Sequence, residues 1–281
     1  MSVLSNEKLR DSIMTKIFLF ATMLTIGLLV FIVFYVLKNG LHVVTLRFLL
    51  ESPTEMGRSG GIYPAIIGTI AVTGLSILIA GPIGVATAIY LTEYTHESAI
   101  SRVVRFGTEN LAGIPSIIFG LFGFLFFVVY LGFGWSILSG ALTLSAMILP
   151  TIVRTSEESI NAVPKAYREI SYALGATRWQ TVTGAVLPSA LPGIVTGIVL
   201  AIGRGIGETA AVIFTAGASL GVPSSIFDPV RTLPVHFYIL AREGISMENA
   251  YGTAAVLIVV ILVINILAYW AMRRFSAKST V

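Results

Sequence analysis

The sequence predicts an all-α membrane protein with six transmembrane helices. Of its 281 residues, 56% are hydrophobic and only 11% are charged, whereas about 25% of the residues in a typical soluble domain are charged. The mean hydropathy is +0.90, and the charges lie between long charge-free stretches. A bilayer therefore has to cover most of the surface. This composition excludes an ordinary cytosolic enzyme, a disordered protein and a nucleic-acid-binding protein.

The first two spans follow from charge-free stretches of sufficient length. Residues 17–37 carry no charge and lie between two lysines, and a span needs about 20 apolar residues. This stretch is too long for the core of a signal peptide, so we expect a retained helix that follows a cytoplasmic segment at 1–16. The second span is expected at about 65–91, where Gly81-Pro82-Ile83-Gly84 is predicted to kink or unwind the helix.

Four further spans complete the predicted bundle. Residues 110–153 form a 44-residue stretch without a charge, which is long enough for two helices joined by a turn at 132–135. The next apolar stretch contains two charges, Arg204 and Glu208. The four spans are expected at 112–131, 136–153, 190–218 and 252–271.

Basic residues indicate the orientation of the helices. Six spans place both termini and the segments 92–108 and 154–189 on one side, which holds twelve lysines and arginines against five on the other. Because cytoplasmic segments carry the excess of positive charge, we expect both termini in the cytoplasm and the helices in the plasma (inner) membrane. This topology accounts for the basic pI of about 9.4 without a nucleic-acid partner, and the lipid bilayer is the expected surroundings of the spans.

The sequence offers no cofactor site. It contains no cysteine, and His42, His96 and His236 lie far apart without the spacing of metal ligands. No G-x-x-x-x-G-K-[ST] motif is present that could hold ATP. Ser116 has no histidine in its span that could activate it as a nucleophile. We therefore expect no catalytic residue, no metal and no cofactor in this chain.

The segment 154–189 is the longest predicted cytoplasmic loop. Within it, 165–174 has the pattern of a short amphipathic helix that Gly175 ends, and a second short helix is expected at about 177–186. One interpretation is a solvated connector, but a flexible connector is rich in glycine and serine. This helix instead has an apolar face without a visible partner in the chain, so we expect it to dock onto another protein. The apolar face consists of Ala166, Ile170, Ala173 and Leu174.

Arg204 and Glu208 are charges inside the fifth predicted span. Arg204 lies 14 residues after Ala190, roughly 21 Å along a helix, and a charge at such a depth costs at least about 2.5–3.5 kcal/mol. One interpretation is a structural ion pair between positions i and i+4, although Arg before Glu is the less favourable order. The other is a substrate pathway, because an arginine binds oxyanions bidentately. Glu208 would then accept a hydrogen bond from a protonated phosphate, which sulfate cannot donate.

The loop also carries a motif known from transport proteins. The run Glu169 to Gly175, followed after nine residues by Ala185-Val186-Leu187-Pro188, resembles the EAA loop of ABC-importer permeases, with departures at positions 170, 171 and 185. The resemblance implies a type I (MetI-like) permease architecture with six transmembrane helices. It also makes this loop the coupling helix that sits in a groove of a separate ATPase subunit. The contact residues that it implies are Glu169, Ala173, Leu174, Gly175 and Arg178.

Further motifs resemble those of phosphate-specific ABC permeases. Arg204-Gly-Ile-Gly-Glu208-Thr209 is similar to their R-x-x-G-E-T segment, and Pro115-Ser116-Ile-Ile-Phe-Gly120-Leu-Phe is similar to their P-S-[IV]-x-x-G-L-F element. Leu233-Pro234-Val235-His236 resembles the outer loop of the PstA type rather than the PstC type. The resemblance extends from about residue 58 onward, and it implies that Arg204, Glu208 and Thr209 lie in the substrate pathway.

The resemblance implies a permease subunit of an ATP-driven importer that moves inorganic phosphate into the cytoplasm. Its expected partners are an ATPase dimer that binds the ATP, a second permease of the PstC type and an external phosphate-binding protein. Two alternatives stay open. One is a permease for another oxyanion, such as sulfate or molybdate; the other is an ion-coupled secondary transporter, which would carry inverted repeats that we do not find. In the outer loop, Asp228, Pro229 and Arg231 either contact an external partner or form turns.

Overall fold

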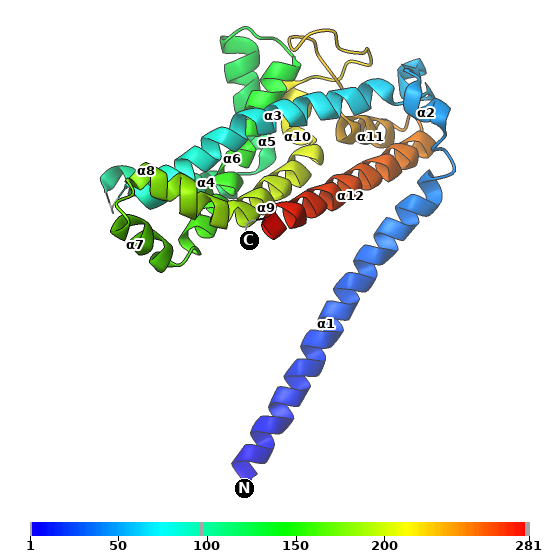
Figure 1. Ribbon diagram of the computed structural model, residues 1–281. Helices are drawn as coiled ribbons and strands as arrows, with labels where there is room; N and C mark the ends of the chain where they lie inside the picture. The colour runs from blue at the N-terminus through cyan, green and yellow to red at the C-terminus, as the bar shows by residue number, and fades with distance from the viewer. Residues whose placement is uncertain (1, 96–97, 279–281) are drawn as a thin grey trace.

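Four long helices lie side by side at the centre of the fold. The computed structural model describes residues 2–95 and 98–278, and the side chains among them except those of 2–9, 100 and 271–278. In chain order they are α3 (Tyr63–Ile89), α6 (Ile137–Asn161), α9 (Leu187–Ile206) and α12 (Met247–Lys278). α6 packs along both α3 and α9, and α12 lies against α9 (Figure 1).

Close packing holds these helices together. Lipid tails are as apolar as leucine, so helices in a bilayer associate through van der Waals contact and close backbone approach. A Cβ atom added to Gly193 or Gly197 of α9 would collide with the side chains of Ser159 and Thr155 of α6. These glycines, which lie four residues apart on one face of α9, are therefore packing residues. The core between the helices is formed by Val72, Leu144, Met147, Ile148, Ile152 and Ala201.

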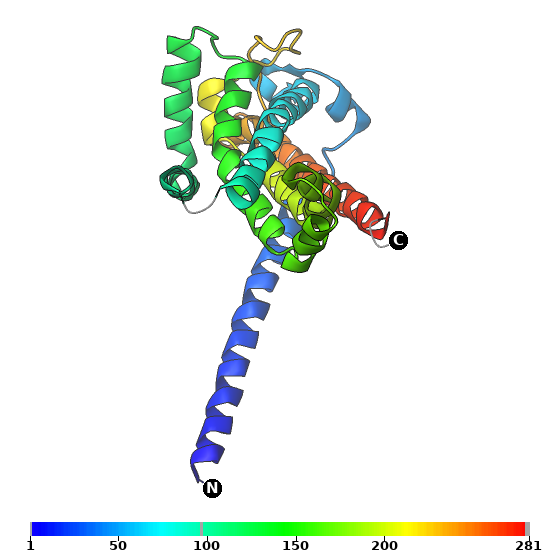
Figure 2. The same cartoon turned by 60° about the vertical axis from the view of Figure 1, so that its left-hand side comes forward.

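The described residues contain five helices long and apolar enough to cross a membrane, and six if one bent pair counts as a single span. The bent pair consists of α4 (Ala99–Gly113) and the helix α5 (Ser116–Gly123), which continues as the π-helical turn η3 (Phe124–Tyr130). The two parts meet at 106° (Figure 2). The bend falls before Pro115, because a residue that precedes proline favours extended backbone. The third span thus begins at Ser116 instead of residue 112, and α4 occupies much of the segment predicted as a loop at 92–108.

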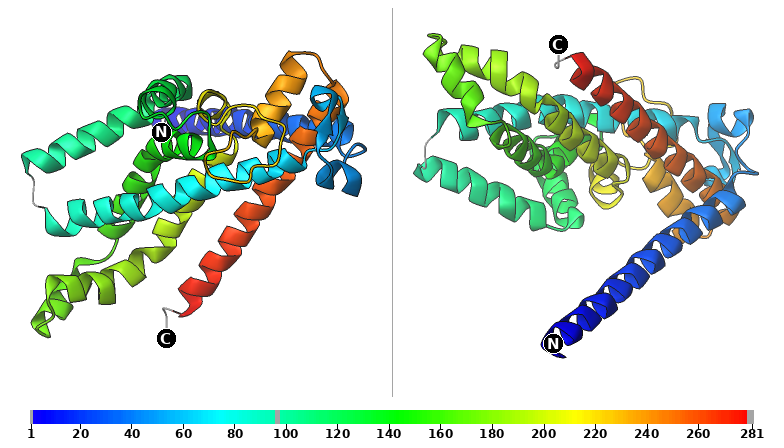
Figure 3. Two further views of the ribbon diagram at one scale, coloured as in Figure 1. Left: turned by 90° about the horizontal axis from the view of Figure 1, so that it is seen from above. Right: turned by 60° about the horizontal axis from the view of Figure 1, so that its bottom comes forward.

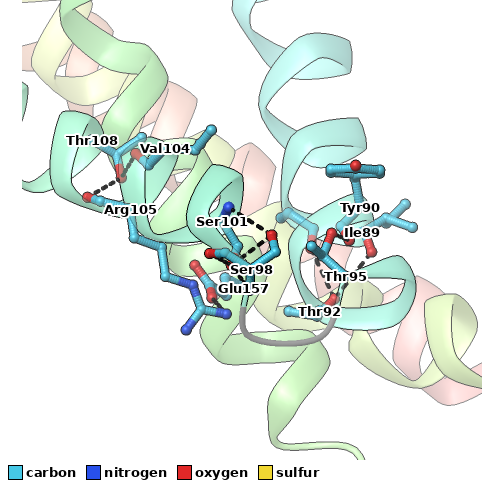
Figure 4. Close-up of polar contacts among 11 residues, drawn as sticks. Ile89, Tyr90, Thr92, Thr95, Ser98, Ser101, Val104, Arg105, Thr108 and Glu157 are labelled. Atoms are coloured by element: carbon cyan, nitrogen blue, oxygen red, sulfur yellow. Dashed lines mark hydrogen bonds and ion pairs between the residues drawn. The ribbon is translucent and has the colours of Figure 1, made fainter.

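Polar side chains set the start of α4 and attach it to α6 (Figure 4). The hydroxyl of Ser98 accepts a hydrogen bond from the backbone N–H of Ser101 at 3.2 Å, which caps the new helix. Arg105 then forms an ion pair with Glu157 of α6 at 2.7 Å. The preceding helix ends in the π-helical turn η2 (Tyr90–Tyr94). The hydroxyl of Thr95 donates to the backbone oxygen of Tyr90 at 2.8 Å and closes this turn.

α3 continues through Pro82, so Gly81-Pro82-Ile83-Gly84 does not unwind this helix, which is one of the two outcomes that the sequence predicts. Gly84 serves contact with α6 instead. A Cβ atom on Gly84 would lie 2.7 Å from Cγ2 of Ile152. The small residue therefore allows α3 and α6 to approach each other closely while the helix continues to Ile89.

α6 is longer than its charge-free stretch. It begins at Ile137 and continues to Asn161, eight residues beyond the predicted end at 153. Its last turns carry the paired side chains Arg154 and Glu158, whose Nε and Oε1 atoms lie 3.2 Å apart. Charges are tolerated there because they lie at the end of the span, where solvent and partners are available. The cytoplasmic loop predicted at 154–189 therefore contains two turns of this membrane helix.

The fifth span begins and ends earlier than predicted. α8 (Arg178–Thr181), η4 (Val182–Val186) and α9 form one continuous helix of 29 residues, so the short helix expected at 177–186 is its first part. This helix ends at Ile206, and the span predicted at 190–218 breaks there. Only the six-residue helix α10 (Ala210–Thr215) follows. Arg204, Gly205, Gly207 and Glu208 surround this point, but charges and glycines of this kind also occur inside continuous membrane helices, so composition alone does not locate the break.

The remaining elements lie at the end of the bundle that is opposite α7 (Lys165–Ala173) (Figure 1). A short antiparallel pair joins Pro53 to Gly60 and Thr54 to Ser59. The turn between the two strands packs beside α11, where Gly57 adjoins His236. These elements are α2 (Leu46–Leu50), β1 (Pro53–Thr54), η1 (Glu55–Gly57), β2 (Ser59–Gly60) and α11 (Leu233–Arg242).

α1 (Ser2–Gly40) extends away from the bundle (Figure 3). It includes both the predicted span 17–37 and most of the preceding segment 1–16 in one helix. Contact with α12 occurs near its C-terminal end, where the rings of Tyr35 and Tyr251 have centroids 6.0 Å apart. Its most apolar stretch is not buried by the chain, so lipid or another subunit has to cover it.

Candidate functional site

The break after α9 places two of the predicted site residues between helices. The backbone N–H of Glu208 donates to the backbone oxygen of Gly205 at 3.2 Å, which closes the last turn of α9. The carboxylate Oε1 of Glu208 accepts from the backbone N–H of Ala211 at 3.1 Å. The backbone oxygen of Thr209 accepts from Ile213 at 2.9 Å. Glu208 thus satisfies a free donor at the start of α10.

Arg204 lies one turn before this break, with an exposed side chain. Among the residues that the structure describes, no ion pair or hydrogen bond joins it to another side chain, so the structural pair with Glu208 is not found. A Cβ atom added to the neighbouring Gly203 would meet nothing within 4 Å. On the other side, Gly205 faces Thr73 and Leu144. Since Thr73 is near the middle of α3, Arg204 lies about halfway along the length of the bundle.

A cavity of about 1030 Å³ adjoins the break. Thr209 lines it, whereas Arg204 and Glu208 do not. The cavity extends from Thr209 to Arg242 at the end of α11 and has mostly apolar walls from α5, α10 and α11. The predicted pathway residues therefore lie close together along the chain, but only one of them faces this hollow. Its other lining residues include Leu121, Phe124, Trp135, Ile213, Phe214, Phe237 and Tyr238.

α7 presents its apolar face to the surroundings. Leu174 is 83% exposed and Ile170 is 59% exposed, and no side chain of α7 is buried. The backbone N–H of Ala176 donates to the oxygen of Ser171 at 3.0 Å, and Gly175 adopts a φ of +83°, which is the glycine-ended helix that the sequence predicts. All five predicted contact residues are exposed: Glu169, Ala173, Leu174, Gly175 and Arg178.

Arg168 is a residue of α7 whose role the sequence pattern does not reveal. It lies off the apolar face of α7, points inward and forms an ion pair with Glu93 of η2 at 2.6 Å. Its guanidinium also donates to the backbone oxygens of Val163 and Ile160 at 2.9 Å each. The two partners of the ion pair are 75 residues apart in the chain. The one signal in the sequence is the acidic Glu93 directly after an apolar span.

Arg178, further along the loop, also contacts η2. Its guanidinium carbon lies 5.7 Å from the centre of the Tyr94 ring, a cation–π geometry. The following segment is buried at Thr181 and Val182. The loop therefore contacts η2 at two successive residues, Glu93 and Tyr94.

The segment between α10 and α11 holds its charged residues within the chain. Asp228 accepts hydrogen bonds from the backbone and hydroxyl of Ser224 and the backbone of Ser225, and these bonds lower its pKa. Arg231 is 5% exposed and donates to the backbone oxygen of Ala218 at 3.1 Å. Asp228 therefore forms a turn, and Arg231 is buried instead of facing an external partner.

His236 is buried beside Arg231. Its Nδ1 lies 3.4 Å from Nη1 of Arg231, and the residue is 1% exposed. Burial, and secondarily the positive charge of Arg231, lower the pKa of His236 from 6.5 to about 4. The imidazole is therefore neutral at physiological pH. Within the described part of the chain, no three histidine, aspartate or glutamate residues come together as metal ligands.

Comparison with known proteins identifies relatives along nearly the whole chain. The family described as binding-protein-dependent transport system inner membrane component matches residues 80–281. The probable ABC transporter permease protein YqgI of Bacillus subtilis (strain 168) is 34% identical, with 98% of this chain and 99% of that protein covered. The phosphate transport system permease protein PstA 1 of Mycobacterium tuberculosis (strain ATCC 25618 / H37Rv) is 37% identical, with 96% and 89% covered.

Solved structures share the fold. A chain of a bacterial alginate ABC transporter, crystallised with a periplasmic protein bound to an alginate pentasaccharide, has a TM-score of 0.66 at 19% identity, with 94% of this chain and 96% of that chain covered. A chain of the MetNI methionine ABC transporter in an inward-facing conformation has a TM-score of 0.64 at 21% identity, with 75% and 94% covered. The architecture is therefore that of the MetI-like permeases of type I ABC importers.

Proposed function

The chain belongs to the family of binding-protein-dependent transport system inner membrane components, and on that premise we propose that it is the PstA-type permease subunit of an ATP-driven importer of inorganic phosphate. Relatives named as PstA phosphate permeases cover most of the chain, at 37% identity in Mycobacterium tuberculosis and 32% in Pasteurella multocida. The observation that carries the proposal is Arg204, a cation near the middle of the bundle that no described carboxylate neutralises.

At the proposed site, Arg204 attracts the anion and its planar guanidinium donates two parallel hydrogen bonds to it. Open space beside Gly203 allows the anion to approach. Glu208 uses Oε1 to hold the start of α10, while Oε2 accepts a hydrogen bond from a protonated phosphate. A fully deprotonated oxyanion has no proton to donate there, so Glu208 repels it.

The cavity next to the break supports a site shared with a second permease. Thr209 faces this apolar hollow, which is open at the surface of the chain. We propose that a PstC-type permease covers it, and that Arg204 and Glu208, which lie beside the cavity and do not line it, face the path between the two subunits together with Thr209. An external phosphate-binding protein would deliver the anion to the end that carries α2 and α11.

The exposed face of α7 supports docking to an ATPase. Leu174 and Ile170 are apolar and uncovered, and an aqueous surface does not favour such a patch. We propose that Glu169, Ala173, Leu174, Gly175 and Arg178 contact a dimeric ATPase that binds and hydrolyses ATP. The chain itself holds no cofactor in this proposal. Both of its termini and α7 lie in the cytoplasm, since that side carries the excess of lysine and arginine.

The test is phosphate uptake by the reconstituted complex. This chain, a second permease and the ATPase are placed in lipid vesicles, with the binding protein added, and radioactive phosphate is followed. We expect uptake to require both ATP and the binding protein, and an excess of sulfate or molybdate to leave it unchanged. Equal competition by sulfate or molybdate would assign the site to oxyanions in general, and ATP-independent uptake by this chain alone would contradict the proposal.

A further inference from the structure

One partly buried ion pair attaches α7 to the membrane helices. Nε and Nη2 of Arg168 donate to Oε1 of Glu93 at 3.0 and 2.6 Å. The side chains are 18% and 6% exposed, respectively. The same guanidinium donates to the backbone oxygens of Val163 and Ile160. Four hydrogen bonds therefore fix one planar group between α7, η2 and the end of α6.

This arrangement requires the shape of arginine as well as its charge. A lysine ammonium is a compact donor on a flexible stem and cannot reach a carboxylate and two backbone oxygens in the same plane. Hydrogen bonds between a guanidinium and a carboxylate are stronger than neutral ones. The contact is consequently stiff, unlike the exposed pair of Arg154 and Glu158, whose side chains are 70% and 66% exposed.

A second arginine strengthens the same attachment from the other side of Gly175. Arg178 lies over the ring of Tyr94, so successive residues of η2 are each held by one arginine of the loop. We call this group of four residues the η2 anchor: Glu93, Tyr94, Arg168 and Arg178.

η2 is the end of a helix that reaches the proposed anion site. Tyr63–Tyr94 form one continuous helix, and Glu93 is 20 residues from Thr73, about 30 Å along the axis. Cγ2 of Thr73 would lie 3.5 Å from a Cβ atom on Gly205. Gly205 is the direct neighbour of Arg204. One continuous helix therefore connects η2 to the level of Arg204.

We infer that Arg168 is a positioning residue for transport: through Glu93, it makes α7 and α3 move as one body, so that a displacement of α7 reaches the break at Arg204. This inference rests on the proposed docking of α7 to an ATPase. The apolar face of α7 receives the displacement, and the η2 anchor on its opposite side passes it on.

The first experiment changes Glu93→Gln in the complete reconstituted complex and measures phosphate transported per ATP hydrolysed. We expect this ratio to fall about tenfold, while the ATPase still co-purifies with the permease. Glu158→Gln is the matched control, because it removes an exposed pair at the same end of α6 and should leave the ratio unchanged. An unchanged ratio in Glu93→Gln would overturn the inference.

A second experiment replaces the ion pair by a covalent link. The chain contains no cysteine, so Glu93→Cys combined with Arg168→Cys introduces a unique pair. A short bis-maleimide should restore the ratio in the assembled complex, whereas N-ethylmaleimide, which modifies both thiols without joining them, should not. This arm also decides the matter if Glu93→Gln fails to assemble, because a cross-linked complex with a low ratio contradicts the inference. Failure of the unmodified complex to transport phosphate would instead contradict the proposed function.

Discussion

Acidification should destabilise the segment around α11, because its buried surroundings make protonation of His236 less favourable in the folded chain than in the unfolded one. The imidazole contacts the guanidinium of Arg231 and packs against the turn at Gly57. In the folded chain its pKa is about 4, whereas an unfolded histidine has a pKa of about 6.5. The depressed pKa means that stability is intact above pH 6.5 and declines as the pH falls from 6.5 towards 4. Below about pH 4 the folded state also binds the proton, and the loss stops growing.

The size of the effect follows from the two pKa values. Between pH 7.5 and pH 5, the unfolded state gains nearly a full proton on this residue and the folded state gains almost none. Linkage then lowers the free energy of unfolding by about 2 kcal/mol. For a chain of this length, that loss corresponds to a fall in the melting temperature of about 3–4 °C.

Thermal unfolding in detergent at pH 7.5 and pH 5 measures this effect. Other groups also titrate in this range, so the informative quantity is the difference in pH dependence between the native chain and His236→Gln. The variant has no titratable group at position 236. We expect the melting temperature of the variant to depend less on pH, by about 3–4 °C across this interval. Equal pH dependence of the two proteins would refute the assignment of a buried neutral imidazole.

Three further predictions concern other parts of the fold. Gly175→Asp places a side chain at a φ of +83°, which costs about 1–2 kcal/mol, and should uncouple ATP hydrolysis from transport; unchanged coupling in vesicles would count against docking at α7. Gly197→Val meets the side chain of Thr155 and should lower the free energy of unfolding by about 1–3 kcal/mol, as measured by thermal unfolding. The control Gly74→Ala has nothing within 4 Å of the added Cβ atom and should have little effect. Equal melting temperatures of the two variants would contradict the close contact of α6 and α9. Arg105→Ala removes the ion pair to Glu157 and should speed hydrogen exchange of α4 amides; unchanged exchange would show that another contact holds α4.

Hydropathy located the membrane helices but not their ends. Hydrocarbon excludes charge, so charge-free stretches mark the interior of each span. α6 continues past residue 153 because Arg154 and Glu158 lie where the helix leaves the hydrocarbon and can pair with each other. The fifth span stops at Ile206 because the backbone breaks at Gly207, between Arg204 and Glu208. These two charges lower the hydropathy locally, but they fit a continuous helix with charges inside it equally well, so hydropathy does not reveal the break.

Local patterns predicted the candidate site in part. The amphipathic spacing of α7 and the glycine that ends it are properties of neighbouring residues, so both could be inferred. The contact of Arg168 with Glu93 joins residues 75 positions apart, and that of Arg231 with His236 depends on how a loop folds inward. These contacts depend on tertiary packing. The alternative interpretation of Arg204 and Glu208 as an ion pair between positions i and i+4 is not found, since the helix that would align them ends between them.

The central claim is that the positive charge of Arg204 faces a water-filled path for anions, and chemical restoration of that charge tests it most directly. In the cysteine-free chain, Arg204→Cys is assembled with partners that lack reactive cysteines, and phosphate uptake is measured before and after treatment with aminoethyl methanethiosulfonate, which adds an ammonium group to the thiol. We predict loss of uptake in the untreated variant, recovery after this reagent but not after the neutral methyl methanethiosulfonate, and slower modification when phosphate is present. Full uptake by the untreated variant, or a thiol that neither reagent reaches, would contradict the account.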